Sequence, residues 1–213
     1  MLGLPPLALV VGLAAGKAAL VALSSLMYLY LSLRWRHQVD WRQLGIIVLI
    51  AGLGLPLGMW LFHVLPRRAS NVLLGAFVIA VGVRGLLKVA PRVVTSPWLS
   101  RAMLFAGGVV HGAFTTGGPL LVVYCRRALP DKSSFRATMG VVWLLLNAAL
   151  MIGWTATGAW SHETWRVTLV GLPFVFAGTA AGEYLHHRVD ERAFAAAVNL
   201  TLIAVGGVLV LAR

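Results

Sequence analysis

The sequence predicts an all-α polytopic membrane protein. Of its 213 residues, 60% are hydrophobic and only 11% are charged, and the mean hydropathy is +0.87. A soluble domain carries about 25% charged residues. Apolar runs recur from one end of the chain to the other, and a membrane-spanning helix needs about 20 such residues. Cys125 is the one cysteine, so an internal disulfide is excluded.

Eight apolar segments can be marked along the chain. They cover about residues 2–16, 18–33, 44–65, 70–87, 102–125, 137–158, 167–187 and 194–212. The first two are marginal in length for a span and the other six are long enough. The pattern therefore predicts about seven or eight transmembrane segments.

The net charge of +12 would suggest nucleic-acid binding in a soluble protein. Here the basic residues fall in short loops between apolar segments. That placement is typical of contact with anionic lipid headgroups and of signals that orient helices in a membrane. We therefore expect a bilayer with anionic headgroups as a partner, and no nucleic acid.

An internal repeat is visible. The stretch GLPLGMWLFHVLPRR begins at Gly54, and GTAAGEYLHHRVDER begins at Gly178, an offset of 124 residues. At this offset Gly82 also matches Gly206, and upstream Lys17 matches Lys132 at an offset of 115. The matches predict two related halves, 1–90 and 101–213. Duplicated halves are common in transporters, where the substrate site lies at the interface of the repeats.

The Lys and Arg residues bear on topology. If all eight segments cross, the 18 basic residues divide nine against nine, and the positive-inside rule gives no orientation. If the fifth segment dips in and returns to the same side, they divide thirteen against five. This hypothesis makes the thirteen-charge side cytoplasmic and the two halves inverted. Splitting a different segment would also give an odd number of spans, so that alternative stays open.

The fifth segment contains GGVVHGAFTTGGP at residues 107–119. Each glycine inside a helix costs roughly 1 kcal/mol and a proline roughly 3 kcal/mol, so a broken or re-entrant helix is predicted. The free N–H groups at the start of the second half-helix would attract an anion. Thr115 and Thr116 add hydroxyl donors, His111 adds a titratable donor, and Pro119 suits a first helical turn. The alternative is that the small residues simply permit close helix packing.

Three further polar residues lie in the middle of apolar segments. Asn147 is in the sixth segment, and Ser24 and Ser25 are in the second, its repeat counterpart. If these segments flank the glycine-rich stretch, the three side chains could complete an anion site. Interhelical hydrogen bonding is the alternative role.

Catalytic and nucleotide-binding signatures are missing from the sequence: it contains no HExxH, GxSxG, CxxC or Walker motif. We therefore predict that the protein is not an enzyme and needs no metal or cofactor.

The stretch GGVVHGAFTTGGPLLVVY resembles the glycine-rich signature of the TauE/SafE family. Supporting stretches are HQVDWRQL at 37–44, GLPLG at 54–58, LPDKSSFRAT at 129–138 and LHHRVDERAF at 185–194. The resemblance covers nearly the whole chain. It implies a multi-pass transporter of small sulfur-containing anions or organic acids, such as sulfite or sulfonates. It assigns the signature positions to Gly112, Thr115, Thr116, Gly117, Gly118 and Pro119, and assigns no role to His111.

The resemblance also implies that each half begins with a glycine-rich segment. In this sequence the first-half counterpart is not matched, because Met1 stands where that segment would end, just before Pro5 and Pro6. We therefore expect a shortened first half.

These observations predict a secondary transporter in the inner membrane that carries a small anion, with export favoured by the resemblance. A non-transporting membrane scaffold and an anion channel are the competing functions, and the sequence leaves a homo-oligomer open. The predicted substrate-binding residues are Ser24, Ser25, His111, Gly112, Thr115, Thr116, Gly117, Gly118, Pro119 and Asn147.

Overall fold

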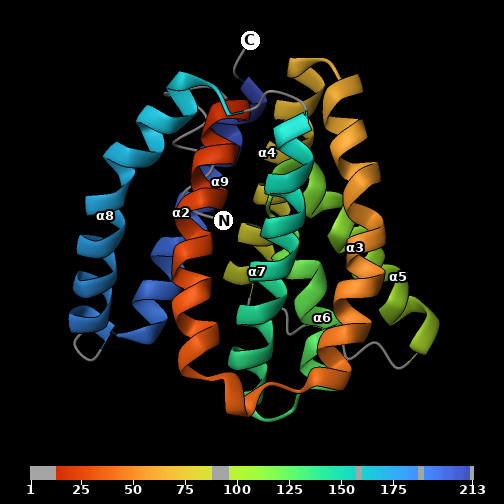
Figure 1. The fold of residues 1–213 in the computed structure, drawn as a ribbon. Helices are drawn as coiled ribbons and strands as arrows, with labels where there is room; N and C mark the ends of the chain where they lie inside the picture. The colour runs from red at the N-terminus through yellow and green to blue at the C-terminus, as the bar shows by residue number, and fades with distance from the viewer. Residues whose placement is uncertain (1–12, 88–95, 157–159, 187–189, 212–213) are drawn as a thin grey trace. The chain divides into compact units, whose positions relative to one another are not determined.

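The computed structural model describes residues 13–87, 96–156, 160–186 and 190–211, and every regular element in these ranges is a helix (Figure 1). The elements in chain order are α2 Leu13–Arg34, the 3-10 turn η1 Arg36–Gln38, α3 Trp41–Val64, α4 Arg67–Leu86, α5 Pro97–Phe114, α6 Gly118–Ala128, α7 Lys132–Ala156, α8 His162–His186 and α9 Glu191–Leu211. The prediction of an all-α protein is confirmed.

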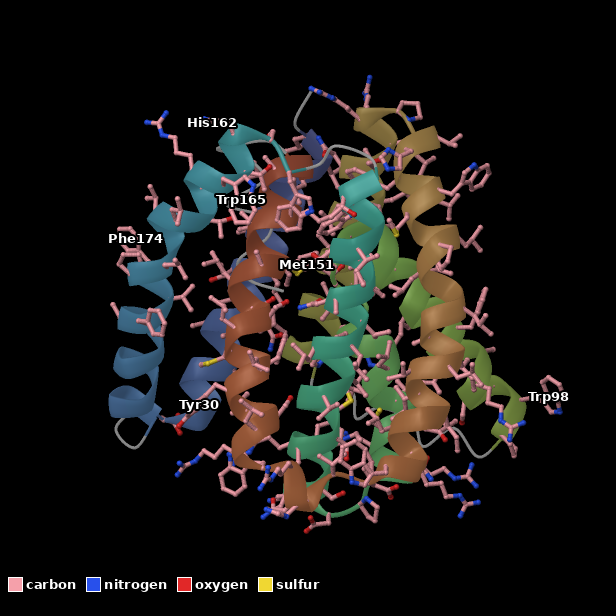
Figure 2. The ribbon with its side chains drawn as sticks, viewed as in Figure 1. Tyr30, Trp98, Met151, His162, Trp165 and Phe174 are labelled. Atoms are coloured by element: carbon pink, nitrogen blue, oxygen red, sulfur yellow. The ribbon has the colours of Figure 1, made fainter. Side chains whose placement is uncertain are left out.

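Four of the described helices are long and apolar enough to cross a membrane. They are the spans Ala15–Arg34, Trp41–Val64, Arg67–Leu86 and Lys132–Thr155, and shorter apolar helices cover Thr164–Gly178 and Ala195–Leu211. Large apolar side chains project outward, among them Trp98 from the start of α5 and Phe174 from α8 (Figure 2). The membrane class is confirmed, while the number of crossings and the halves 1–90 and 101–213 stay predictions.

The helices form two compact units. One contains the beginning of α2 up to Leu23, together with α4, α8 and α9; the other contains α2 from Ser24 onward, η1, α3, α5, α6 and α7. Each unit draws helices from both of the predicted halves.

In the second unit, α3 and α5 pack backbone against backbone. Four glycines form the contact: Gly54 and Gly58 on α3, and Gly108 and Gly112 on α5. A Cβ atom added to Gly54 would lie 2.5 Å from the carbonyl oxygen of Phe105, and one added to Gly108 would meet the backbone of Ala51. Gly108 meets Ala51, and Gly112, one turn later, meets Leu55. Residue numbers thus increase in the same direction on both helices, so α3 and α5 run parallel. Close packing through small residues is therefore confirmed for this part of the glycine-rich stretch.

Helix α5 ends at Phe114 and α6 starts at Gly118, so the break is narrower than the predicted 107–119. Glycines in the first part of the stretch remain helical because α3 packs on them. Thr115 has φ 56° and ψ 23°, the one positive φ among the described non-glycine residues, and its amide donates to the carbonyl of His111 at 2.7 Å. Pro119 lies in the first turn of α6, as predicted.

Helix α6 turns back along α5 (Figure 1). A Cβ added to Gly107 would meet the side chain of Leu121, which makes the two helices antiparallel. The hydroxyl of Tyr124 donates to Gln43 Oε1 at 2.9 Å, near the beginning of α3. Because α5 runs parallel to α3, the first residues of α5 and the last residues of α6 lie at the same end of the unit.

Helix α7 begins at that end as well. The backbone N–H of Asp40, just before α3, donates to Thr138 Oγ1 at 2.9 Å. All eight described Lys and Arg residues of this unit lie at the helix ends gathered here, and all are exposed: Arg34, Arg36, Arg42, Arg101, Arg126, Arg127, Lys132 and Arg136. The opposite end, where α3 and α7 finish, carries none in the described part of the unit.

In the first unit, α4 and α9 form a close antiparallel pair. A Cβ added to Gly75 would lie 2.7 Å from the carbonyl oxygen of Gly206. One added to Gly82 would lie 2.8 Å from the carbonyl oxygen of Asn199. Here too the backbones approach because glycine lacks a side chain.

The α3–α5 contact predicts opposite effects for two glycines on one helix. Gly54→Ala should lower the melting temperature, because its Cβ would meet backbone atoms of α5 that cannot move alone. Gly52→Ala should leave it unchanged or raise it, since nothing lies within 4 Å and alanine favours a helix by about 1 kcal/mol. Thermal unfolding in detergent measures both. Equal effects of the two substitutions would contradict the packing described here.

The backbone of Thr115 predicts that glycine is better tolerated there than threonine. The left-handed region costs a residue with a Cβ roughly 1–2 kcal/mol, against roughly 0.5–1 kcal/mol for the freedom of glycine. Thr115→Gly should therefore raise the melting temperature. Thr116→Gly is the matched control and should lower it, because Thr116 is not in that region. A fall in melting temperature for Thr115→Gly would count against the strained break.

Candidate functional site

The break between α5 and α6 carries two buried hydroxyl groups. Thr115 Oγ1 and Thr116 Oγ1 are both shielded from solvent and have no hydrogen-bond partner in the described part of the chain. Thr116 is only 2% exposed. A buried polar group without a partner costs about 1–3 kcal/mol, so such a group calls for an explanation. A bound ligand with acceptor atoms would supply the missing partners.

The first turn of α6 adds backbone donors to the same place. The first N–H groups of a helix have no partner within it, and the helix dipole makes this end positive. Leu120 and Leu121 both donate to the carbonyl of Gly117, so their amides are used in starting the helix. Pro119 has no N–H, which leaves Gly118 and the residues of the break as the backbone donors of this turn.

A chain of polar side chains joins α5 to α7 and α2. His111 Nε2 lies 3.1 Å from Asn147 Oδ1. The Nδ2 of Asn147 donates to Ser24 Oγ at 3.2 Å and to Ser25 Oγ at 3.3 Å. The structure thus brings together four of the predicted residues, and the second and sixth segments do flank the glycine-rich one. The hydrogen bonds are interhelical, and a role in substrate binding stays a prediction.

Trp143 joins the polar chain to the break. It lies one helical turn before Asn147 on α7, and its ring is centred 5.0 Å from that of His111. A Cβ added to Gly118 would lie 3.6 Å from the same ring, so Trp143 covers the start of α6. Trp143 was not among the predicted site residues. Its spacing of four residues from Asn147, which places both on one helix face, was the available signal.

The glycines of the predicted site have different surroundings. A Cβ added to Gly117 would meet the carbonyl of Gly107 and lie 2.9 Å from the Cβ of His111, so no side chain fits there. Gly118 has room for a methyl group against Trp143. Gly112 faces the backbone of Leu55 on α3, which gives it a packing contact, and its assignment to substrate binding stays a prediction.

Negative charge is distant from the break in the described part of this unit. Its two carboxylates, Asp40 and Asp131, lie at the basic end, where they accept the backbone amides of Gln43 at 2.9 Å and Ser134 at 2.7 Å. Each carboxylate thus caps the start of a helix. Among the described residues, no group of three His, Cys, Asp or Glu side chains could hold a metal ion. The break therefore combines two hydroxyl donors with the start of a helix, and its assignment to anion binding stays a prediction.

Comparison with known proteins identifies the family of the chain. The family model described as sulfite exporter TauE/SafE matches residues 1–209. The chain is 30% identical over 172 residues to the "Probable inner membrane transporter protein TsaS" of Comamonas testosteroni, a match that covers 80% of this chain and 72% of that protein. No solved structure matches. The chain therefore belongs to the TauE/SafE family of multi-pass membrane transporters.

Proposed function

We propose that the protein is a secondary transporter of small anions in the inner membrane, with sulfite, sulfonates or related organic acids as substrates. The observation that carries the proposal is the break itself. Two buried hydroxyls without partners lie beside the positive start of α6. The description of the family and the name of the relative in Comamonas testosteroni support transport, and export is the direction that the family's description favours.

The oxygen atoms of such an anion match the donors of the site. The hydroxyls of Thr115 and Thr116 and the amides at the start of α6 would donate to them. Hydrogen bonds to a charged group contribute about 1.5–3 kcal/mol each. Sulfite, sulfonate and carboxylate oxygens accept these hydrogen bonds in similar ways, so the donors favour the whole class over any one member.

The charge distribution supports a re-entrant hairpin. The eight basic residues of the second unit lie at the end where α5 begins and α6 finishes. The positive-inside rule makes this end cytoplasmic. Helices α5 and α6 then enter the membrane from the cytoplasm and return to it, and Thr115–Gly117 lies at the tip of the hairpin.

Two helix pairs support inverted halves. At the repeat offset of 124, Gly75 corresponds to Asn199 and Gly82 corresponds to Gly206. Replacing each residue by its repeat counterpart turns the pair Gly75–Gly206 into the pair Asn199–Gly82. The structure contains both contacts. A contact that maps onto itself when its partners exchange indicates a two-fold axis. Because α4 and α9 are antiparallel, the axis is perpendicular to the helices and lies in the plane of the membrane.

The pair α2 and α7 behaves in the same way at the offset of 115. Ser32 corresponds to Asn147, and Ser25 corresponds to Gly140. A Cβ added to Gly140 would lie 3.8 Å from the hydroxyl of Ser32, and Asn147 bonds Ser25 at 3.3 Å. Replacing each residue by its counterpart at this offset turns the pair Ser32–Gly140 into the pair Asn147–Ser25. In the proposed inversion, Asn147, a residue of the proposed site, corresponds to Ser32 of the first half.

Substitutions at the break should reduce anion flux without unfolding the protein. Gly118→Leu should abolish uptake of sulfite, thiosulfate, sulfoacetate or a small carboxylate into proteoliposomes, because the added side chain would collide with Trp143. Thr116→Val should raise the substrate concentration at half-maximal flux about 10- to 100-fold, because one hydrogen bond to the anion is lost. Its melting temperature should hold or rise, because the replaced buried hydroxyl has no described partner.

Gly118→Ala is the matched control, since its Cβ would make ordinary contact with Trp143, and its flux should remain close to that of the native protein. Flux that saturates and shows counterflow indicates a carrier, whereas flux that rises linearly with concentration indicates a channel. Unchanged flux in Gly118→Leu would overturn the proposed site.

The hairpin predicts the sidedness of single cysteines in a Cys125→Ala background. Trp98→Cys, at the start of α5, and Ser133→Cys, after α6, should both react with a membrane-impermeant thiol reagent only from the cytoplasm, like Gln38→Cys. His63→Cys and Thr155→Cys, at the opposite helix ends, should react from the other side. If α5 and α6 together crossed the membrane once, positions 98 and 133 would label from opposite sides.

A further inference from the structure

We infer that Asn147, oriented by Ser24 and Ser25, is a positioning residue that fixes His111 in the tautomer with hydrogen on Nε2. The inference concerns the same site as the proposed function and rests on that function only for its consequence in transport. It is carried by the direction of the hydrogen bonds in the chain from α2 through α7 to α5.

The donor and acceptor roles along the chain are assigned starting from Ser25. Its hydroxyl donates to the sulfur of Met151 at 3.8 Å (Figure 2 labels Met151). The single hydrogen of that hydroxyl is then used, which leaves the oxygen of Ser25 as an acceptor towards Asn147. The amide of Asn147 is oriented accordingly: its NH₂ group faces the serines and donates to Ser24 and Ser25.

The orientation of the amide determines the imidazole. With both of its N–H groups directed at the serines, Asn147 presents its carbonyl oxygen to His111 at 3.1 Å. An amide oxygen only accepts, so Nε2 of His111 must be the donor. Nε2 therefore carries the hydrogen in this arrangement, and any further proton that the ring gains goes to Nδ1.

The surroundings hold the ring in place. His111 is 3% exposed, the tilted ring of Trp143 is centred 5.0 Å from its own, and a Cβ added to Gly117 would lie 2.9 Å from its Cβ. Of the other described titratable groups of this unit, Tyr124 and Cys125 lie on α6, His63 lies beyond Leu55 on α3, Tyr28 and Tyr30 lie on α2, and His37 lies in η1. The eight Lys and Arg residues lie at the basic end described above. The carboxylate of Asp40 precedes Leu55 by about four turns of α3. An amide thus positions the ring in the described part of this unit.

For the proposed site, the consequence is a defined place for proton exchange. The Nε2 side of the ring is bound to Asn147, so Nδ1 is the nitrogen at which the ring can take up and release a proton. In the protonated ring both nitrogens donate, and the added positive charge stabilises an anion at the break.

The experiment is ¹⁵N NMR of the ligand-free protein in lipid bilayers, with histidine labelled and the pH alkaline so that the imidazole is neutral. The sequence has six histidines, and a difference spectrum with His111→Gln assigns the signal. The two tautomers give separate pairs of ring-nitrogen resonances. A single tautomer with hydrogen on Nε2 is expected. A neutral ring with hydrogen on Nδ1 overturns the inference.

Two variants test the cause. Ser24→Ala/Ser25→Ala removes the acceptors that orient the amide, so Asn147 can turn over, and a second set of His111 resonances should appear. Ser32→Ala is the matched control on the same helix: its hydroxyl is buried with no described partner, and the signal should stay single. An unchanged spectrum in the double variant overturns the role of the serines.

Asn147→Asp keeps the size of the side chain and replaces the amide by a carboxylate. A carboxylate only accepts, so hydrogen should remain on Nε2 even without an amide to orient. Appearance of the Nδ1–H tautomer in this variant would overturn the inference. Because the spectra need no substrate, they separate the two proposals: absence of saturable flux in the transport assay refutes the proposed function, and only the tautomer decides the role of Asn147.

Discussion

The backbone contact between α3 and α5 supports the remainder of the second unit. Four glycines allow the two helices to approach until main-chain atoms touch. In lipid, the hydrophobic effect does little to drive helices together, and close van der Waals packing takes its place. The contact keeps the glycine-rich part of α5 helical up to Phe114, and this fixes where the chain must break.

The break in turn fixes the chemistry. Non-helical backbone at membrane depth is tolerated where protein surrounds it, and α7 supplies that cover through Trp143. Thr115 holds a backbone conformation that threonine rarely adopts, and strained residues of this kind tend to occur at functional sites. Donors without partners, a positive helix start and an oriented histidine meet within a few residues of this strain.

Charge and symmetry give the site its setting. The basic residues gather at the open end of the hairpin, which places the hairpin on the cytoplasmic side in the proposed topology. The self-related contacts of α4 with α9, and of α2 with α7, support the inverted halves. Alternating access in transporters with inverted repeats is movement of one repeat against the other around a fixed site.

The sequence by itself determined the membrane class, the family, the break near Thr115 and the place of Pro119, because hydropathy, glycine content and proline geometry are local properties. Only the tertiary structure decided which glycines bend the chain and which pack. Gly108 and Gly117 look alike in sequence, yet one faces α3 and the other ends the break. Trp143 and the pairing of His111 with Asn147 depend on the register of α7 against α5, and register is set by the packing of whole helices rather than by neighbouring residues.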